Sequence, residues 1–312
     1  MTFAENDPNN NGSPPPSSAS GTSNAQDRPG GESQAGLPAN PPALSGEFGV
    51  VEPPINPVPE DLRITWSWPH LAAFLLFCGG SFLVFVIVLD VYLLGVRHMT
   101  PQEIQKVPSF IVPYLIAGQA ALSVLILLFL YVTLCALRGA PFWKTLGWRP
   151  FAADVASKRG SVPRFLLWGA GLSLLVLILQ SLVHPTGKVP IEELLNDRQN
   201  ARLFMLMAVF LAPFFEETVF RGYLYPLFAR KLGTGPGILL TGVLFGALHG
   251  AQLGWTFGYV GILSAVGVIF TFVRARTGTV FASFLMHFGY NSVLAVGYLL
   301  AVEFGPRISQ GH

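Results

Sequence analysis

Long apolar runs constrain this chain of 312 residues more than any other feature of its sequence. A run of about 20 apolar residues can cross the hydrocarbon of a bilayer as a helix, because a helix satisfies its own backbone hydrogen bonds. Only 12% of the residues are charged, which agrees with a membrane protein. We expect seven spans, at residues 70–96, 109–137, 165–183, 201–229, 236–253, 256–274 and 279–304.

The fifth and sixth of these runs are joined by very few residues, so they form either two full spans or a hairpin that does not fully cross. The sequence therefore predicts an all-α fold, a polytopic transmembrane helical bundle of about seven spans, or eight with a hairpin. "PFWKTLGWRP", Pro141 to Pro150, mixes aromatic and basic residues. It is either a short amphipathic helix along the membrane surface or a solvated loop.

The first sixty residues have a different composition, since they hold 12 of the chain's 25 prolines and few large apolar groups. Such a segment cannot bury enough surface to offset its ordering entropy. We predict a disordered Pro/Gly/Ser/Asn-rich tail at 1–60, the first two spans with a basic loop at 61–164, and a third region at 165–305 that holds most intramembrane polar residues.

Positive charge alternates between the connections and predicts the orientation of the chain. The connections after the second, fourth and sixth runs are the basic ones, with Arg138, Lys144, Arg149, Lys158, Arg159, Arg164, Arg230, Lys231, Arg274 and Arg276. The positive-inside rule therefore places the N-terminus in the cytoplasm and the C-terminus outside.

Ionisable side chains inside apolar runs are costly, by about 2.5–3.5 kcal/mol at a helix centre on insertion scales, and they indicate a functional site. The last four runs contain a small set of such polar residues: Glu216, Glu217, Arg221, His249, His287 and Asn291. Counted from the predicted cytoplasmic ends, these residues can share one layer of the membrane. We expect a site that opens toward the cytoplasm.

Helical spacing separates the two glutamates. Glu217 and Arg221 are four residues apart and share a helix face, whereas Glu216 is turned away from Arg221. We therefore expect a structural ion pair between Glu217 and Arg221 and a reactive role for Glu216. His287 and Asn291 are also four residues apart, so both can project into one cavity.

Glycines recur every four residues around His249, at Gly242, Gly246 and Gly250, and the spacing continues at Gly254 and Gly258. Small residues at this spacing let two membrane helices approach closely. Close packing explains the glycines without any chemistry, and it would bring His249 up to its neighbours.

Three short motifs lie in order on the helices that carry these polar residues. "EETVFR" fits EExxxR, "FGALH" fits FxxxH and "HFGYN" fits HxxxN. In these motifs the chain resembles the CAAX prenyl protease and bacteriocin-processing family of intramembrane peptidases, also called the Abi family. The resemblance covers roughly residues 165–304, and it implies cleavage of a peptide bond near a carboxyl terminus or next to the membrane.

The resemblance also implies roles for the residues. Glu216 and His249 would activate a water molecule, His287 and Asn291 would stabilise the oxyanion, and Glu217 and Arg221 would support them. The expected partners are the lipid bilayer and a membrane-associated protein or peptide substrate, with no nucleic acid.

The residue types leave the cofactor open. Amide hydrolysis needs an activated water and donors aimed at the oxyanion, which Glu216, the two histidines and Asn291 can supply without a metal. One carboxylate and two imidazoles, Glu216, His249 and His287, could instead hold a zinc ion. The chain has no HExxH motif.

Two other functions compete with that of a peptidase. A proton-coupled transporter also uses membrane carboxylates and histidines, but the sequence shows no convincing internal repeat. A catalytically silent family member would keep the fold and act as a scaffold or immunity protein.

Overall fold

The computed structural model describes residues 59–105, 109–136, 139–151, 162–183 and 197–304. The chain divides into two units, Met1–Ile55 and Asn56–His312. The first unit lies outside the described residues. The tail predicted at 1–60 therefore falls almost entirely outside the described part. Within that part, all regular elements are helical and none is a strand, which confirms the predicted all-α fold.

Among the described residues, six helices are long and apolar enough to cross a membrane: Trp68–Val96, Val112–Leu134, Val162–Ser181, Arg198–Leu232, Phe257–Thr277 and Val280–Leu300. They correspond to six of the seven predicted spans. The remaining run forms the shorter helix α11, Thr234–Leu248, of 15 residues. At a rise of about 1.5 Å per residue it is about 22 Å long, less than the roughly 30 Å of hydrocarbon in a bilayer.

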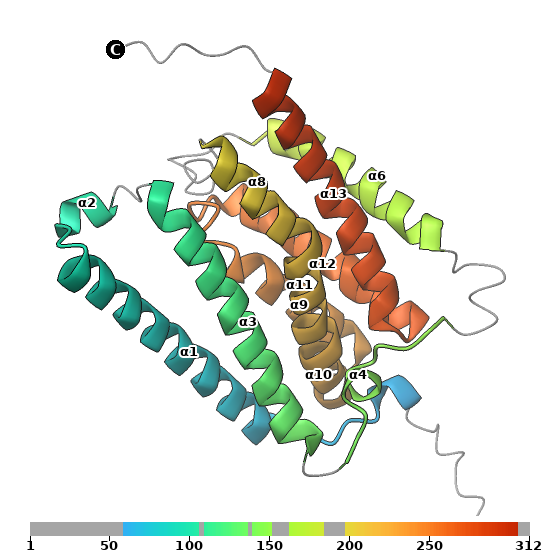
Figure 1. Cartoon of the computed structure of the whole chain (residues 1–312). Coiled ribbons are helices and arrows are strands. Elements are labelled where there is room, and N and C mark those ends of the chain that lie inside the picture. Colours follow the sequence, from blue (N-terminus) through green and yellow to red (C-terminus); the bar gives the residue numbers. More distant parts are fainter. Residues whose placement is uncertain (1–58, 106–108, 137–138, 152–161, 184–196, 305–312) are drawn as a thin grey trace, which may run out of the picture. The chain divides into compact units, whose positions relative to one another are not determined.

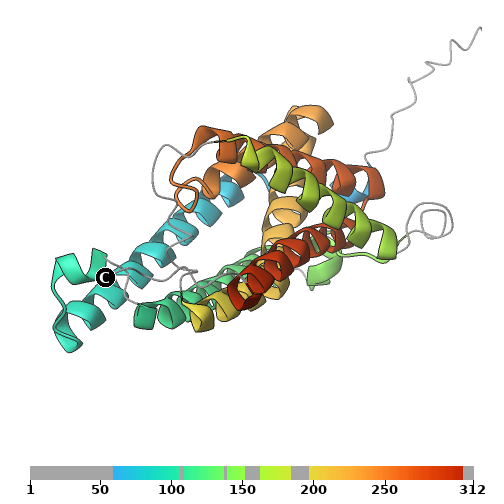
Figure 2. The same cartoon turned by 90° about the horizontal axis from the view of Figure 1, so that it is seen from above.

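The described helical elements follow one another along the chain (Figure 1). Their bounds are η1 Glu60–Leu62, α1 Trp68–Asp90, η2 Val91–Val96, α2 Pro101–Gln105, η3 Ser109–Ile111, α3 Val112–Leu134, α4 Phe142–Thr145, α6 Val162–Ser181, α8 Arg198–Leu206, η5 Met207–Leu211, α9 Ala212–Glu216, η6 Glu217–Leu224, α10 Tyr225–Leu232, α11 Thr234–Leu248, α12 Phe257–Thr277 and α13 Val280–Phe304. α13 lies beside α6, and α1 lies beside α3 (Figures 1 and 2).

The helix from α8 to α10 is continuous but irregular, because η5 and η6 are π-helical. It begins at Asp197, whose side chain accepts a hydrogen bond from the backbone N–H of Asn200 at 2.8 Å, a normal N-cap. Pro213 and Pro226 each lie in the first turn after a π segment. A proline inside a helix has no N–H to donate and crowds the preceding turn, and widened turns accommodate it.

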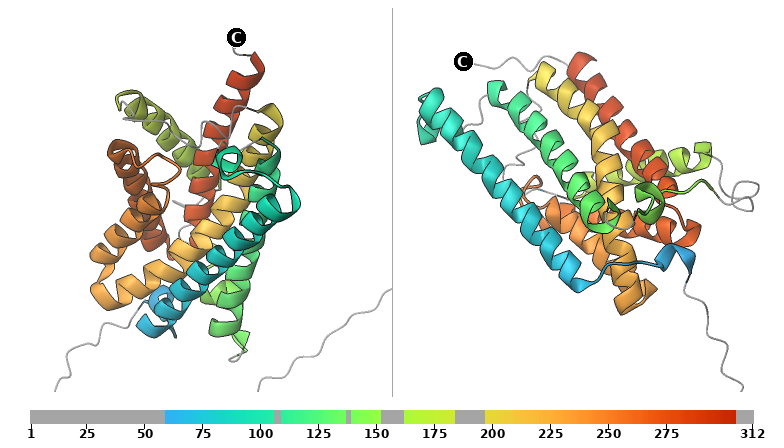
Figure 3. Two further views of the ribbon diagram at one scale, coloured as in Figure 1. Left: turned by 90° about the vertical axis from the view of Figure 1, so that its left-hand side faces the viewer. Right: turned by 60° about the horizontal axis from the view of Figure 1, so that its bottom comes forward.

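Helices α11 and α12 form a hairpin that is visible in the left panel of Figure 3. A Cβ atom on Gly242 would collide with the backbone of Val268, and one on Gly246 would collide with that of Ser264. Small residues are therefore required where the two helices touch, as the four-residue spacing predicted.

The segment from residue 139 to 151 enters the bundle instead of lying flat on a surface. α4 is a helix of only four residues, and Leu146 after it is fully buried. A Cβ on Gly222 would lie 2.8 Å from the carbonyl oxygen of Leu146, so the segment touches the backbone of η6.

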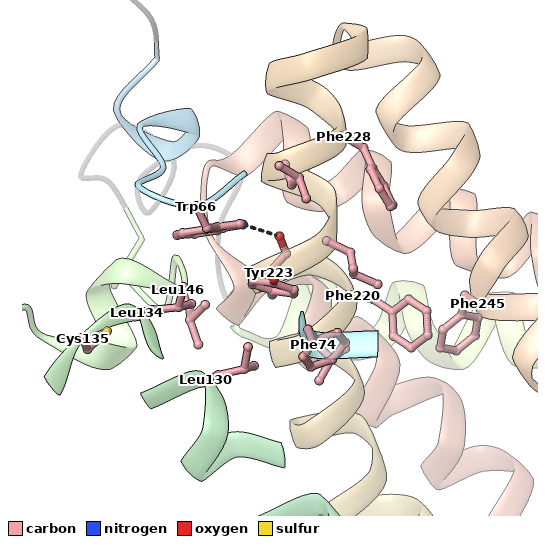
Figure 4. Close-up of a cluster of buried hydrophobic side chains, with 13 residues drawn as sticks. Trp66, Phe74, Leu130, Leu134, Cys135, Leu146, Phe220, Tyr223, Phe228 and Phe245 are labelled. Atoms are coloured by element: carbon pink, nitrogen blue, oxygen red, sulfur yellow. Dashed lines mark hydrogen bonds between the residues drawn. The ribbon is translucent and has the colours of Figure 1, made fainter. Parts of the chain in front are cut away.

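Residues before α1 pack at the same end of the bundle. The indole N–H of Trp66 donates to the carbonyl of Tyr223 at 3.1 Å, and Trp66 is 2% exposed (Figure 4). Asp61 pairs with the buried Arg274 at 3.0 Å. Figure 4 also shows Leu146, Phe74 and Phe220 in this hydrophobic cluster, which thus joins segments far apart in the sequence.

Candidate active site

Three helices bring Glu216, His249 and His287 together. Glu216 ends α9, His249 follows the last residue of α11, and His287 lies in the second turn of α13. One carboxylate oxygen of Glu216 lies 3.8 Å from Nε2 of His249, and the other lies 3.8 Å from Nε2 of His287. These distances are too long for direct hydrogen bonds but suit a bridging water.

Glu217 turns to the other side of the same helix and is fully buried. Its Oε1 accepts from Nη1 of Arg221 at 2.8 Å, which confirms the predicted ion pair, and it lies 2.9 Å from Nδ1 of His287. Arg221 is also fully buried. Buried charges persist only when they are paired and hydrogen-bonded, and the contact of Glu217 with His287 links this pair to α13.

The guanidinium of Arg221 connects η6 to α12 as well as to Glu217. Nη2 donates to the carbonyl of Gly267 at 2.9 Å, and Nε donates to the hydroxyl of Thr271 at 3.3 Å. The Cζ atom lies 4.7 Å from the ring centre of Phe245 and 5.4 Å from that of Phe270. Cation–π contacts add to the stabilisation of a desolvated arginine.

The end of α11 fixes the ring of His249. The backbone N–H of His249 donates to the carbonyl of Gly246, three residues back, instead of that of Phe245, four residues back. The carbonyl of Phe245 therefore lacks the usual helical donor. Nδ1 of His249 lies 2.7 Å from that carbonyl. Because a carbonyl only accepts, Nδ1 carries the proton, and the opposite nitrogen Nε2 faces Glu216.

His287 is held in a similar way and is only 3% exposed. Nδ1 donates to the Glu217 carboxylate, and Nε2 points to Glu216. The ring also packs on Phe270, with ring centroids 4.8 Å apart. The two glutamates thus contact opposite nitrogens of one imidazole.

Asn291 lies one turn after His287 and lines the same cavity. Its amide nitrogen donates to the carbonyl of Ala208 at 2.7 Å. Ala208 belongs to the π-helical η5, where the widened turn disturbs the usual backbone pairing. The amide nitrogen carries a second hydrogen, which is not used by Ala208.

A cavity of about 470 Å³ adjoins this cluster. Its wall is largely apolar, and among its lining residues are the polar groups Gln119, Ser123, Gln180, Glu216, His249, Gln252, His287, Tyr290 and Asn291. Glu216 and His249 are about one-fifth exposed, so they form an accessible polar part of the cavity wall.

The geometry agrees with the grouping that the sequence suggested, since Glu216, His249, His287 and Asn291 share one cavity and Glu217 and Arg221 lie behind it. Their chemical roles stay predictions. Sequence reasoning did not identify three features of the site. These are the bond between His287 and Glu217, the bond from Arg221 to the hydroxyl of Thr271, and the glutamines that line the cavity. Thr271 lies four residues after Gly267, but that spacing carries no recognisable signal.

Comparison with known families decides which family this helical region represents. Residues 198–293 match the family model described as type II CAAX prenyl endopeptidase Rce1-like. The match contains the EExxxR, FxxxH and HxxxN residues. The match supports membership of the CAAX prenyl endopeptidase family on residues 198–293.

That family implies peptidase activity in general, and the six long apolar helices among the described residues indicate an integral, multi-pass membrane protein. Its setting therefore includes a lipid bilayer and a protein or peptide substrate. Searches of curated proteins and of solved structures found no match.

The donor set of this candidate site can be compared with that of a metal site. Each histidine anchors Nδ1 and presents Nε2, which is the usual arrangement of metal-binding histidines. Among the described residues, however, no three His, Cys, Asp or Glu side chains lie close enough together to hold an ion. The donor types fit zinc, whereas the positions would have to tighten to bind it.

Proposed function

We propose that this protein is an intramembrane endopeptidase that hydrolyses a peptide bond of a membrane-associated protein or peptide. One observation carries the proposal: the two carboxylate oxygens of Glu216 each face Nε2 of a different histidine at 3.8 Å, at the wall of a cavity. A water molecule placed among these three groups would be polarised by all of them.

Glu216 is the general base in this proposal. It removes a proton from the water as the oxygen attacks the carbonyl carbon of the substrate, and His249 orients that water through Nε2. The tetrahedral intermediate then collapses, the C–N bond breaks, and Glu216 returns the proton to the leaving amine. The carboxylate thus ends each cycle in its starting form.

His287 and Asn291 stabilise the negative oxygen of the intermediate. His287 uses its Nδ1 proton for Glu217, so its role requires the doubly protonated ring, with a second donor at Nε2. Asn291 offers the hydrogen that Ala208 does not use. Donors that are already held in place act on the oxyanion without reorganisation.

The donor types of the site also fit a divalent metal ion. Glu216, His249 and His287 would hold it, and a bound ion would supply a Lewis acid for the carbonyl and an activated water. Glu217 would then orient His287 as a ligand through Nδ1.

The experiment that tests the function is cleavage of a fluorogenic, membrane-anchored peptide by the purified full-length protein in detergent, with metal analysis of the same sample. We expect cleavage by the wild type and its loss in Glu216→Gln. Loss in chelator together with stoichiometric zinc would assign a metallopeptidase, and activity that persists in chelator would assign the metal-free mechanism.

The absence of cleavage by folded wild-type protein would contradict the proposal. It would favour a catalytically silent scaffold or immunity protein, or a proton-coupled transporter. A proton flux across reconstituted vesicles that is lost in Glu216→Gln would select the transporter.

A further inference from the structure

Among the described residues, the lining of the cavity extends from the Glu216 cluster toward one end of the bundle. On the long helix its lining runs from Glu216 back to Phe204, toward the start of α8. On α13 it runs from His287 forward to Leu294, and on α3 it covers the first half, 112–123. Figure 1 shows the start of α3, the start of α8 and the end of α13 at the same end of the bundle.

Packing closes the opposite direction. On the long helix every residue from Glu217 to Ala229 is buried, whereas Phe204, Met207, Ala208 and Glu216 on the cavity side are all partly exposed. The closing layer consists of residues 60–67 and 139–151, which place Trp66 and Leu146 against η6.

Trp148 strengthens this closing layer. Its indole N–H donates to the hydroxyl of Thr218 at 3.1 Å, and its ring lies 5.3 Å from that of Phe214 and 5.4 Å from that of Phe284. The backbone of Gly147 also accepts from the N–H of Val280, the first residue of α13. The segment thus joins the helix of Glu216 to the helix of His287.

The two ends of the helical bundle differ in the charged residues that they carry. The closed end carries the acids Glu60 and Asp61 and most of the described basic residues, which are Arg63, Lys144, Arg149, Arg164, Arg230, Lys231, Arg274 and Arg276. The end to which the cavity leads carries Arg97, Arg198 and Arg202 together with the acids Asp90, Glu103 and Asp197. By the positive-inside rule the closed end faces the cytoplasm.

We propose that the catalytic cavity opens on the non-cytoplasmic side of the membrane, opposite to the side that the sequence led us to expect. The proposal rests on the proposed peptidase function and names its substrate class. The substrate is a membrane-anchored or translocated polypeptide that presents an extended segment to the outer face, and not a cytoplasmic carboxyl terminus.

Three amide side chains in the largely apolar wall of the cavity suit an extended polypeptide. Gln119 on α3, Gln180 on α6 and Gln252 after α11 each present an amide with both a donor and an acceptor. An extended peptide also alternates donors and acceptors, and these need partners wherever water is scarce. These three amides therefore give a peptide backbone hydrogen-bonding partners within a wall that is otherwise largely apolar.

Cysteine accessibility tests the direction of the cavity. The full-length chain has only two cysteines, so Cys78→Ala with Cys135→Ala gives a cysteine-free background. Gln119→Cys or Gln252→Cys is introduced into this background to report on the cavity. Lys231→Cys is introduced into the same background as the marker of the basic end. A membrane-impermeant maleimide is then applied to right-side-out and to inverted vesicles.

We expect the two cavity cysteines to react only in right-side-out vesicles and Lys231→Cys to react only in inverted vesicles. Labelling of all three from the same side, or of the cavity cysteines from neither side, would overturn the proposal. Accumulation of each variant at the level of the background protein shows that it has folded.

Cleavage in the same vesicles separates the two proposals. The fluorogenic, membrane-anchored peptide is added to the outside of either preparation. We expect cleavage in right-side-out vesicles that is lost in inverted ones. Cleavage only in inverted vesicles would overturn the direction and keep the peptidase, whereas outward labelling without cleavage on either side would keep the direction and overturn the peptidase.

Discussion

Glu216 and Glu217 are adjacent in sequence yet lie in opposite kinds of surroundings. Glu217 is fully buried, and one of its oxygens meets Arg221 and His287 at 2.8 and 2.9 Å. Glu216 is about one-fifth exposed and has both histidines at 3.8 Å. The difference teaches that a buried charge with close partners stabilises the structure, whereas a partly exposed carboxylate that faces two imidazoles at a cavity wall is available for chemistry.

The same substitution at both positions tests this comparison most strongly. Glu216→Gln should reduce peptide cleavage by about 10²–10⁴-fold, the usual contribution of a general base, and leave the thermal unfolding temperature in detergent unchanged. Glu217→Gln should lower that temperature and the amount of folded protein, because Arg221 loses its counter-ion. Equal loss of folding in both variants would remove the distinction between the two glutamates.

The partner of Glu217 should show the largest effect on stability. Arg221→Ala leaves a buried carboxylate unpaired, and breaking a buried pair costs about 3–5 kcal/mol. We expect poor accumulation in membranes and early thermal unfolding of the purified protein. Arg276→Ala, a change of an exposed arginine on α12, is the matched control and should behave as the wild type.

Asn291 tests the cavity side of the comparison. Asn291→Ala removes a proposed oxyanion donor, and loss of one such donor lowers kcat by about 10²–10³-fold. The measurement is kcat and KM on the anchored peptide, with kcat falling far more than KM changes. Ser292→Ala serves as the control, because the Ser292 hydroxyl only bonds to the carbonyl of Phe288 on its own helix. An unchanged kcat would remove Asn291 from the mechanism.

The smallest expected effect concerns the layer that closes the site. Trp148→Phe keeps an aromatic ring against Phe214 and removes the hydrogen bond to Thr218. Loss of one such bond costs about 0.5–1.5 kcal/mol, so we expect a slightly lower unfolding temperature in thermal denaturation. Trp143→Phe, at a more exposed tryptophan of the same segment, should change less.

Much of the fold could be predicted because each membrane helix is encoded locally. Twenty apolar residues specify a span wherever they occur, so the limits of α3 and α12 lie within a few residues of the predicted runs. The pairing of Glu217 with Arg221 was predictable for the same reason, since a helix places residues four apart on one face.

The sequence by itself thus determined the long apolar helices, the Glu217 and Arg221 pair, and the set of polar residues within the region that matches the CAAX prenyl endopeptidase model. Tertiary structure alone decided that His287 lies between the two glutamates, that residues 139–151 enter the bundle, and that the cavity leads away from the basic end. The physical reason is the separation along the sequence of the residues that interact. Helix formation and spacing depend on neighbours along the chain, whereas these features depend on how residues separated by 70 or more positions pack together.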